Sequence, residues 1–156
     1  MTAVPTVSVD NQLEALTDDE CGLLLDLSSV GRIAFVVDGL PVILPINYRS
    51  LSDKFDQRWI LIRTRPGTSI DRAPEKVAFE IDGIDHENHK GWSVLTRGVL
   101  RHLNDDEIEQ LSTRFDPKPW ARHERSSWLA ITPELITGRR LQNNEHEWAF
   151  PSEAYL

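Results

Sequence analysis

Runs of apolar residues along the chain are short and rich in β-branched and aromatic types, the composition of strands rather than of helices. These runs predict about six strands, over residues 32–37, 40–47, 58–64, 76–82, 92–103 and 128–132. Because the strands follow one another in meander order, we expect a mainly β (α+β) fold, an antiparallel β-barrel with short flanking helices. The segment 49–57 is expected to be a polar loop.

Glycine and proline mark the places where the expected strands turn, bend or reach the edge of the sheet. Asp38-Gly39 predicts a tight hairpin turn, because both central positions of a type I′ turn need a positive φ. Pro41 and Pro45 lack the amide hydrogen that pairs strands, so their strand should lie at an edge or carry a break. Gly98 predicts a bend or a bulge in a long strand.

Two capping signatures predict the start of helices. Thr17 and Glu20 have the spacing of a capping box, in which each side chain bonds the backbone amide of the other residue. The helix that follows should end within residues 28–31. Asn104 caps a second helix, which we expect to run to about Arg114.

Length and charge limit the classes of protein that this sequence can specify. The 156 residues suffice for one domain, which we place at residues 13–156 behind a flexible N-terminal arm of residues 1–12. The formal net charge of −8 argues against nucleic acid or an anionic membrane as a partner. Cys21 is the only cysteine, so no intrachain disulfide can form, which suits a reducing compartment. No secretory signal is visible and no apolar run approaches the roughly 18 residues of a membrane span, so we expect a cytoplasmic protein.

The segment that follows the third expected strand carries the clearest candidate chemistry. Arg63 and Thr64 end the strand, Gly67 makes a turn, and Thr68 and Ser69 stand where a short helix is expected to begin. Amides and hydroxyl groups at a helix start, together with guanidinium groups, are what a phosphate monoester requires. The segment therefore indicates a phosphate site, although a solvated polar turn has the same composition. It lacks the glycine-rich patterns of NTPase loops and dinucleotide sites.

A second candidate site, for a metal ion, is suggested by His86, Glu87 and His89. Zinc sites need three or four ligands in a defined geometry, and this segment is otherwise very polar. We interpret it as a solvated loop and predict no metal site. No Ser–His–Asp set is evident from spacing either.

Five segments occur in a fixed order within residues 20–141: VGRIAF at 30–35, PVILPINY at 41–48, ILIRTRPGT at 60–68, VAFEID at 77–82 and GWSVLTRG at 91–98. In this order they resemble the pyridoxamine 5′-phosphate oxidase-like flavoproteins. The late segment ITGRRL at 136–141 is similar to the closing strand of the same family.

The resemblance implies a split β-barrel that forms a homodimer, with FMN in the groove between the subunits and a small-molecule substrate. It implies that Arg63 and Thr64 reach the phosphate and ribityl chain, and that residues 45–47 lie beside the flavin ring. The strand that carries Trp92 and Ser93 would contribute to the flavin pocket, either of its own chain or of the partner subunit. The cofactor-binding residues implied are Pro45, Asn47, Arg63, Thr64, Gly67, Thr68, Ser69, Trp92 and Ser93.

Two departures from the family pattern bear on cofactor and substrate. Ser69 stands where many relatives carry Lys or Arg, which leaves Arg63, Arg65 and Arg72 as candidates to supply the charge. After Trp128 the Arg and His pattern that holds pyridoxal phosphate is not recognisable, so we do not expect vitamin oxidation. The leading hypothesis is an FMN-dependent oxidoreductase of unknown substrate. The alternatives are a flavin-binding module for storage or sensing, and the same fold with a deazaflavin or haem.

Overall fold

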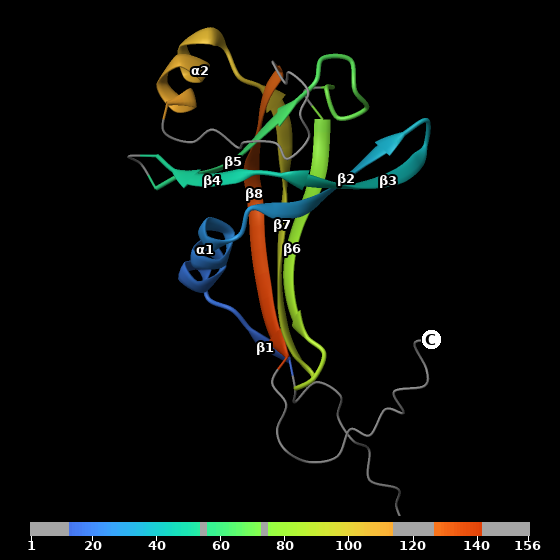
Figure 1. Ribbon diagram of the computed structural model, residues 1–156, viewed down its shortest axis with the longest axis vertical. Helices are drawn as coiled ribbons and strands as arrows, with labels where there is room; N and C mark the ends of the chain where they lie inside the picture. The colour runs from blue at the N-terminus through green and yellow to red at the C-terminus, as the bar shows by residue number, and fades with distance from the viewer. Residues whose placement is uncertain (1–12, 54–55, 73–74, 114–126, 142–156) are drawn as a thin grey trace, which may run out of the picture.

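The computed structural model describes residues 13–53, 56–72, 75–113 and 127–141. Within these ranges the chain forms two helices and one sheet of eight strands, shown in Figure 1. In chain order the elements are β1 (Leu13–Ala15), α1 (Asp18–Leu27), β2 (Val30–Val37), β3 (Leu40–Asn47), β4 (Arg49–Ser52), β5 (Arg58–Thr64), β6 (Glu75–Asp85), β7 (Lys90–His102), α2 (Asp105–Ser112) and β8 (Ser127–Leu141).

Strand pairing is antiparallel throughout the sheet, and the sheet does not close on itself. The strand order is β3-β2-β6-β7-β8-β5-β4, with β1 added to β8. The long strands β6, β7 and β8 run side by side along the molecule, whereas β2 and β3 project from one side as a hairpin (Figure 1). The predicted mainly β, split-barrel class is therefore confirmed.

The local turn and edge signals of the sequence are confirmed. Asp38 and Gly39 both have positive φ, 50° and 80°, and join β2 to β3 as the expected hairpin. Pro41 and Pro45 lie on β3, which is at the end of the strand order. A register shift between β7 and β8 falls at Arg97/Gly98, where the sequence predicted a bend or bulge.

Both predicted helix starts are also confirmed. Thr17 caps α1 in a complete capping box with Glu20, and Asn104 caps α2 in the same way with Glu107. The helix α2 ends at Ser112, close to the expected end. The predicted N-terminal arm, residues 1–12, lies outside the described residues. Neither helix of the described ranges has the length and apolar composition that crossing a membrane requires.

Several strands differ from the sequence prediction. The expected polar loop 49–57 contains a strand, β4, because Leu51 is buried while its polar neighbours hydrogen-bond along β5. The apolar run 128–132 and the segment 136–141, which resembles the closing strand of the family, form one continuous strand, β8. Its second half contains polar residues that face away from the core, and pairing with β1 and β7 sustains it there.

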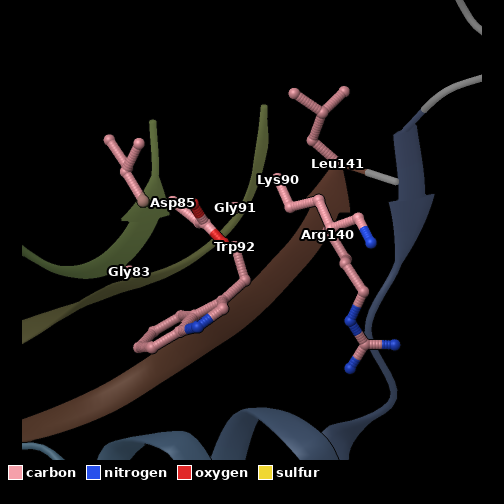
Figure 2. Close-up of a pocket in the computed structure, with 8 residues that line it drawn as sticks. Gly83, Asp85, Lys90, Gly91, Trp92, Arg140 and Leu141 are labelled. Carbon is pink, nitrogen blue, oxygen red and sulfur yellow. The ribbon is translucent and has the colours of Figure 1, made fainter. Parts of the chain in front are cut away.

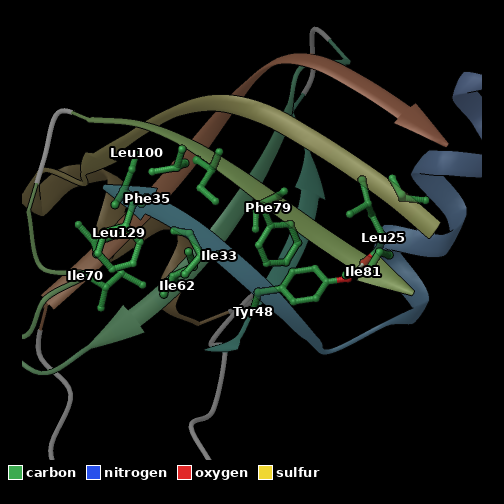
Figure 3. Close-up of a cluster of buried hydrophobic side chains, with 14 of the residues drawn as sticks. Leu25, Ile33, Phe35, Tyr48, Ile62, Ile70, Phe79, Ile81, Leu100 and Leu129 are labelled. Carbon is green, nitrogen blue, oxygen red and sulfur yellow. Dashed lines mark hydrogen bonds between the residues drawn. The ribbon is translucent and has the colours of Figure 1, made fainter. Parts of the chain in front are cut away.

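Two groups of buried side chains hold the fold together on opposite faces of β5. The larger fills the barrel and is shown in Figure 3; there Tyr48 meets Phe79 edge to face, with ring centroids 4.8 Å apart. The Tyr48 hydroxyl donates to the carbonyl of Leu25 at 2.7 Å, and burial raises its pKa to about 12. The smaller group lies under α2 and includes Leu61 and Trp128. Because β5 contributes side chains to both groups, it is packed on both of its faces.

Candidate functional site

A hollow of about 310 Å³ opens between the edge strand β3 and the end of β5, and we call it the β3–β5 hollow. Apolar side chains from both strands and polar groups from the turn after β5 meet there. Its lining residues are Leu44, Pro45, Ile46, Asn47, Ile62, Arg63, Thr64, Thr68, Ser69 and Ile70. The structure thus joins two segments that the sequence analysis assigned to one site and that lie far apart along the chain.

Most of the sequence-predicted site residues gather at this hollow. Gly67 is not among the lining residues but belongs to the same turn, where its φ of +78° needs a residue without a side chain. The predicted residues that line the hollow are Pro45, Asn47, Arg63, Thr64, Thr68 and Ser69.

The turn after β5 is not the helix start that the sequence predicted. The amide of Thr68 donates to the carbonyl of Arg65 at 3.3 Å, and the amide of Asp71 donates to that of Thr68 at 2.9 Å. These bonds close successive tight turns, and no helical residue is present between Arg65 and Arg72. The helix prediction is wrong here because the Asp71 carboxylate accepts from the amide of Gly67 and bends the backbone back. A helix dipole therefore does not contribute to this site.

Two threonine hydroxyls brace the turn from within. The Oγ1 atoms of Thr64 and Thr68 are 2.8 Å apart, and Thr68 Oγ1 also donates to the carbonyl of Arg65 at 3.0 Å. Thr64 is 2% exposed, so its hydroxyl reaches only close neighbours. Ser69 is exposed, and no hydrogen bond joins its side chain to another residue of the described ranges. Among the side-chain hydroxyls of this turn, that of Ser69 is therefore the one available to donate to a ligand.

The three arginines near the turn differ in their surroundings. Arg63 lies across from Trp128 on β8, with its guanidinium carbon 4.9 Å from the indole centroid. Arg72 is paired with Glu75 at 3.2 Å. Arg65 is exposed and makes no ion pair with any residue that the structure describes. Arg63, held against an aromatic face, lines the hollow, whereas Arg65 is closer to the turn in sequence but is not among the lining residues.

Asp71 is a site residue that the sequence analysis missed. Its Oδ2 accepts from the amide of Gly67 at 2.8 Å, and its Oδ1 accepts from the Ser127 hydroxyl and lies 2.9 Å from His102 Nε2. The hydrogen bond from Ser127, then those from Gly67 and His102, hold the pKa of the Asp71 carboxyl below its usual range. An Asp four residues after a turn glycine was the available signal, but its two distant partners are visible only in the fold.

Trp92 and Ser93 do not reach the β3–β5 hollow of their own chain. Trp92 packs against the barrel core and lines a second hollow of about 470 Å³ near the far end of β6 and β7. In Figure 2 its indole and the Arg140 side chain extend to the same side of the sheet, toward α1. Ser93 lies opposite Asp82 and Arg139 in the sheet and lines neither hollow. Within one chain these two residues belong to a different region.

The histidine-containing loop between β6 and β7 is a compact polar turn. Asp85 accepts from the backbone amides of Glu87 and Asn88, both at 3.1 Å, and from the Asn88 side chain at 2.8 Å. Throughout the described ranges, no three His, Cys, Asp or Glu side chains gather closely enough to hold a metal ion.

Comparison with known proteins identifies the class to which this fold and site belong. Residues 17–140 match the family model described as pyridoxamine 5′-phosphate oxidase, and the chain belongs to this family. The resemblance inferred from the sequence is confirmed.

Several relatives match more than four fifths of the chain. The FAD binding protein from Mycobacterium smegmatis is 35% identical, with 83% of this chain and 99% of that chain covered and a TM-score of 0.69. An FAD-binding protein from Mesorhizobium loti is 25% identical with the same coverage and a TM-score of 0.63. The uncharacterized protein Rv0080 of Mycobacterium tuberculosis is 29% identical over 133 residues, 81% of this chain and 84% of its own.

Proposed function

We propose that this chain binds a flavin nucleotide in the β3–β5 hollow, with a phosphate at residues 67–69, and uses it as an oxidoreductase. The observation that carries the proposal is the convergence of an apolar strand edge and a hydroxyl-rich turn flanked by arginines. The family membership and the FAD-binding relatives support a flavin as the ligand.

The residue types of the hollow suit the two ends of such a ligand. Leu44, Ile46 and Ile62 offer apolar contacts for a flat ring, with Pro45 and Asn47 beside them. Ser69 offers a hydroxyl group, and Arg63 the positive charge, for a phosphate, while the Thr68 hydroxyl braces the turn. A bound flavin supplies hydride or electron transfer, while the protein binds and orients it.

The hollow itself contains no side chain suited to general acid–base catalysis. Its lining residues include no Asp, Glu, His, Lys, Cys or Tyr. In this proposal Asn47, Arg63 and the hydroxyl residues bind and orient, and protons come from water or from a small-molecule substrate. The acidic net charge and the single cysteine favour a cytoplasmic protein without a nucleic-acid partner.

FMN is the cofactor that we expect to bind more tightly than FAD, because the turn provides for a single phosphate group. FAD is the second candidate, since the 35% identical relative binds it. Titration of the purified protein with both flavins separates the two, and tighter or equal binding of FAD would refute the FMN preference. The absorbance of the protein as purified distinguishes a flavin from a deazaflavin or haem. A bound flavin without turnover would indicate storage or sensing.

A homodimer is the expected assembly. The strand β3 has a partner on one side only, and Leu40 and Ile43 on it are 69% and 65% exposed. A second copy would cover this edge and bring its own Trp92 and Ser93 toward the flavin. Sedimentation at micromolar concentration should give twice the 17.8 kDa mass of the chain. A monomer that binds flavin with full affinity would contradict a groove shared between subunits.

A further inference from the structure

We propose that Asp71 is a positioning residue, whose carboxylate holds the turn at residues 67–69 in the shape that receives the phosphate. It does so by tying the turn to the ends of β7 and β8. This inference rests on the proposed function, because it assigns Asp71 a role toward the phosphate of the same flavin nucleotide.

The Asp71 carboxylate joins three separate segments of the chain. One oxygen accepts from the Gly67 amide at 2.8 Å, inside the turn. The other accepts from Ser127 at the start of β8 and contacts His102 at the end of β7, at 2.9 Å. The side chain is only 14% exposed, so water competes weakly for these bonds.

The anchors of this carboxylate belong to the rigid part of the sheet. Ser127 is the direct partner of Thr64 in the pairing of β5 with β8, and Thr64 is the last residue before the turn. The amide of Leu103, the residue after His102, donates to the carbonyl of Trp128 at 3.0 Å. Through Asp71 the turn is therefore fastened to the end of β7 and the start of β8.

The turn has few other constraints on its shape. Gly67 has a φ of +78° and a side-chain-free backbone that can adopt many other conformations. The remaining bonds are local: backbone amides donate from Thr68 to Arg65 and from Asp71 to Thr68, and the Thr68 hydroxyl contacts Thr64 and Arg65. A ligand that bound a loose turn would have to order it first, which lowers affinity, whereas a turn held in place binds without that cost.

The negative charge of the Asp71 carboxylate would repel a phosphate bound at the turn. Both oxygens of Asp71 are engaged by donors, from Gly67 on one side and from Ser127 and His102 on the other. These donors offset the negative charge, so we expect ordering of the turn to outweigh repulsion. The carboxyl of Asp71 is ionised at neutral pH and accepts from all three donors, which together lower its pKa.

Asp71→Asn tests the inference, because an amide has one acceptor oxygen and cannot accept from Gly67 and Ser127 with both atoms. We expect the affinity for FMN to fall about ten-fold and that for riboflavin, which has no phosphate, to stay unchanged. Hydrogen exchange of the Gly67 amide in the ligand-free protein should become faster. Ser127→Ala, which removes one anchor, should shift both measurements in the same direction by less.

The control variant is Asp53→Asn. Asp53 also accepts a turn amide, that of Gln57 at 2.9 Å, but in the loop between β4 and β5 and outside the hollow. It should leave the ratio of FMN to riboflavin affinity unchanged.

Different results would contradict the positioning role of Asp71 and the proposed flavin binding. Unchanged or tighter FMN binding by Asp71→Asn would overturn the positioning role, as would an equal loss for FMN and riboflavin. If the wild-type protein does not distinguish FMN from riboflavin, the proposed function fails. Exchange at Gly67 would then still report whether Asp71 orders the turn.

Discussion

Arg63→Ala is expected to weaken FMN binding by about ten-fold to more than a hundred-fold, while riboflavin binding stays nearly unchanged. The substitution removes a charge-assisted contact of roughly 1.5–3 kcal/mol with the phosphate. Arg63 lines the β3–β5 hollow, and Trp128 restrains its guanidinium from the opposite strand. Fluorescence titration of the variant with both flavins measures the effect.

The control for this experiment is Arg101→Ala. Arg101 stacks over Trp59 with its guanidinium carbon 5.1 Å from the indole centroid, and it lies outside the hollow. It therefore removes an arginine–indole contact, which contributes about 0.5–1 kcal/mol to stability at exposed sites, and no residue of the turn itself. It also removes the ion pair of Arg101 with Glu107 and a hydrogen bond to the carbonyl of His102, so a larger loss of stability than for Arg63→Ala is expected. Its FMN affinity should equal that of the wild type.

Alanine variants of neighbouring residues show which arginine binds the phosphate. Thr68→Ala should cost about 1 kcal/mol of FMN binding, since it removes a hydroxyl that holds the turn through Arg65 and Thr64. If Arg65→Ala instead of Arg63→Ala produces the large selective loss, the counter-charge lies at Arg65. If FMN and riboflavin weaken equally, Arg63 acts on the ring or on the fold. If neither weakens, residues 67–69 are a solvated turn.

Gly98→Ala is expected to destabilise the protein by about 3 kcal/mol, because a Cβ has no room at the bulge. A Cβ at this position would lie 2.1 Å from the carbonyl oxygen of Thr132 and 3.0 Å from the Cα of Pro133. These are backbone atoms of the paired strand β8, so only a shift of the sheet relieves the contact. Thermal unfolding should show a decrease in Tm of roughly 6–12 °C for a domain of this size.

Gly91→Ala on the same strand serves as the matched control. Its Cβ would lie 3.1 Å from the carbonyl oxygen of Gly83, so a movement of a few tenths of an ångström suffices. A much smaller change in Tm is expected. Equal stability of the Gly98→Ala variant and the wild type would show that β7 and β8 do not meet at this bulge as described.

Features set by a residue's own backbone preferences could be predicted from the sequence. The positive φ values at Asp38 and Gly39 and the cap at Thr17 depend on neighbours within a few positions. Pro45 predicted an edge strand because it has no amide to donate. The segment that contains Gly67 was identified as a candidate site from its residue types and their order, and a hollow lies beside it.

Features that depend on distant pairing could not be predicted in the same way. The strand β4 is polar and gains its structure from β5, with Leu51 as its buried residue. The turn after β5 was expected to start a helix, but Asp71 is bound by Ser127, 56 positions away. Trp92 was assigned to the flavin pocket of its own chain or of the partner subunit; within its own chain it packs against the core near α1, and its place in a dimer stays a prediction.

The affinity of the wild-type protein for FMN relative to riboflavin tests the central claim most directly. The two ligands share the ring and the ribityl chain, so the difference between their dissociation constants isolates the phosphate. Recognition of the phosphate at residues 67–69 predicts that FMN binds at least about ten-fold more tightly than riboflavin. Equal affinity for the two flavins, or no binding of either, would contradict it.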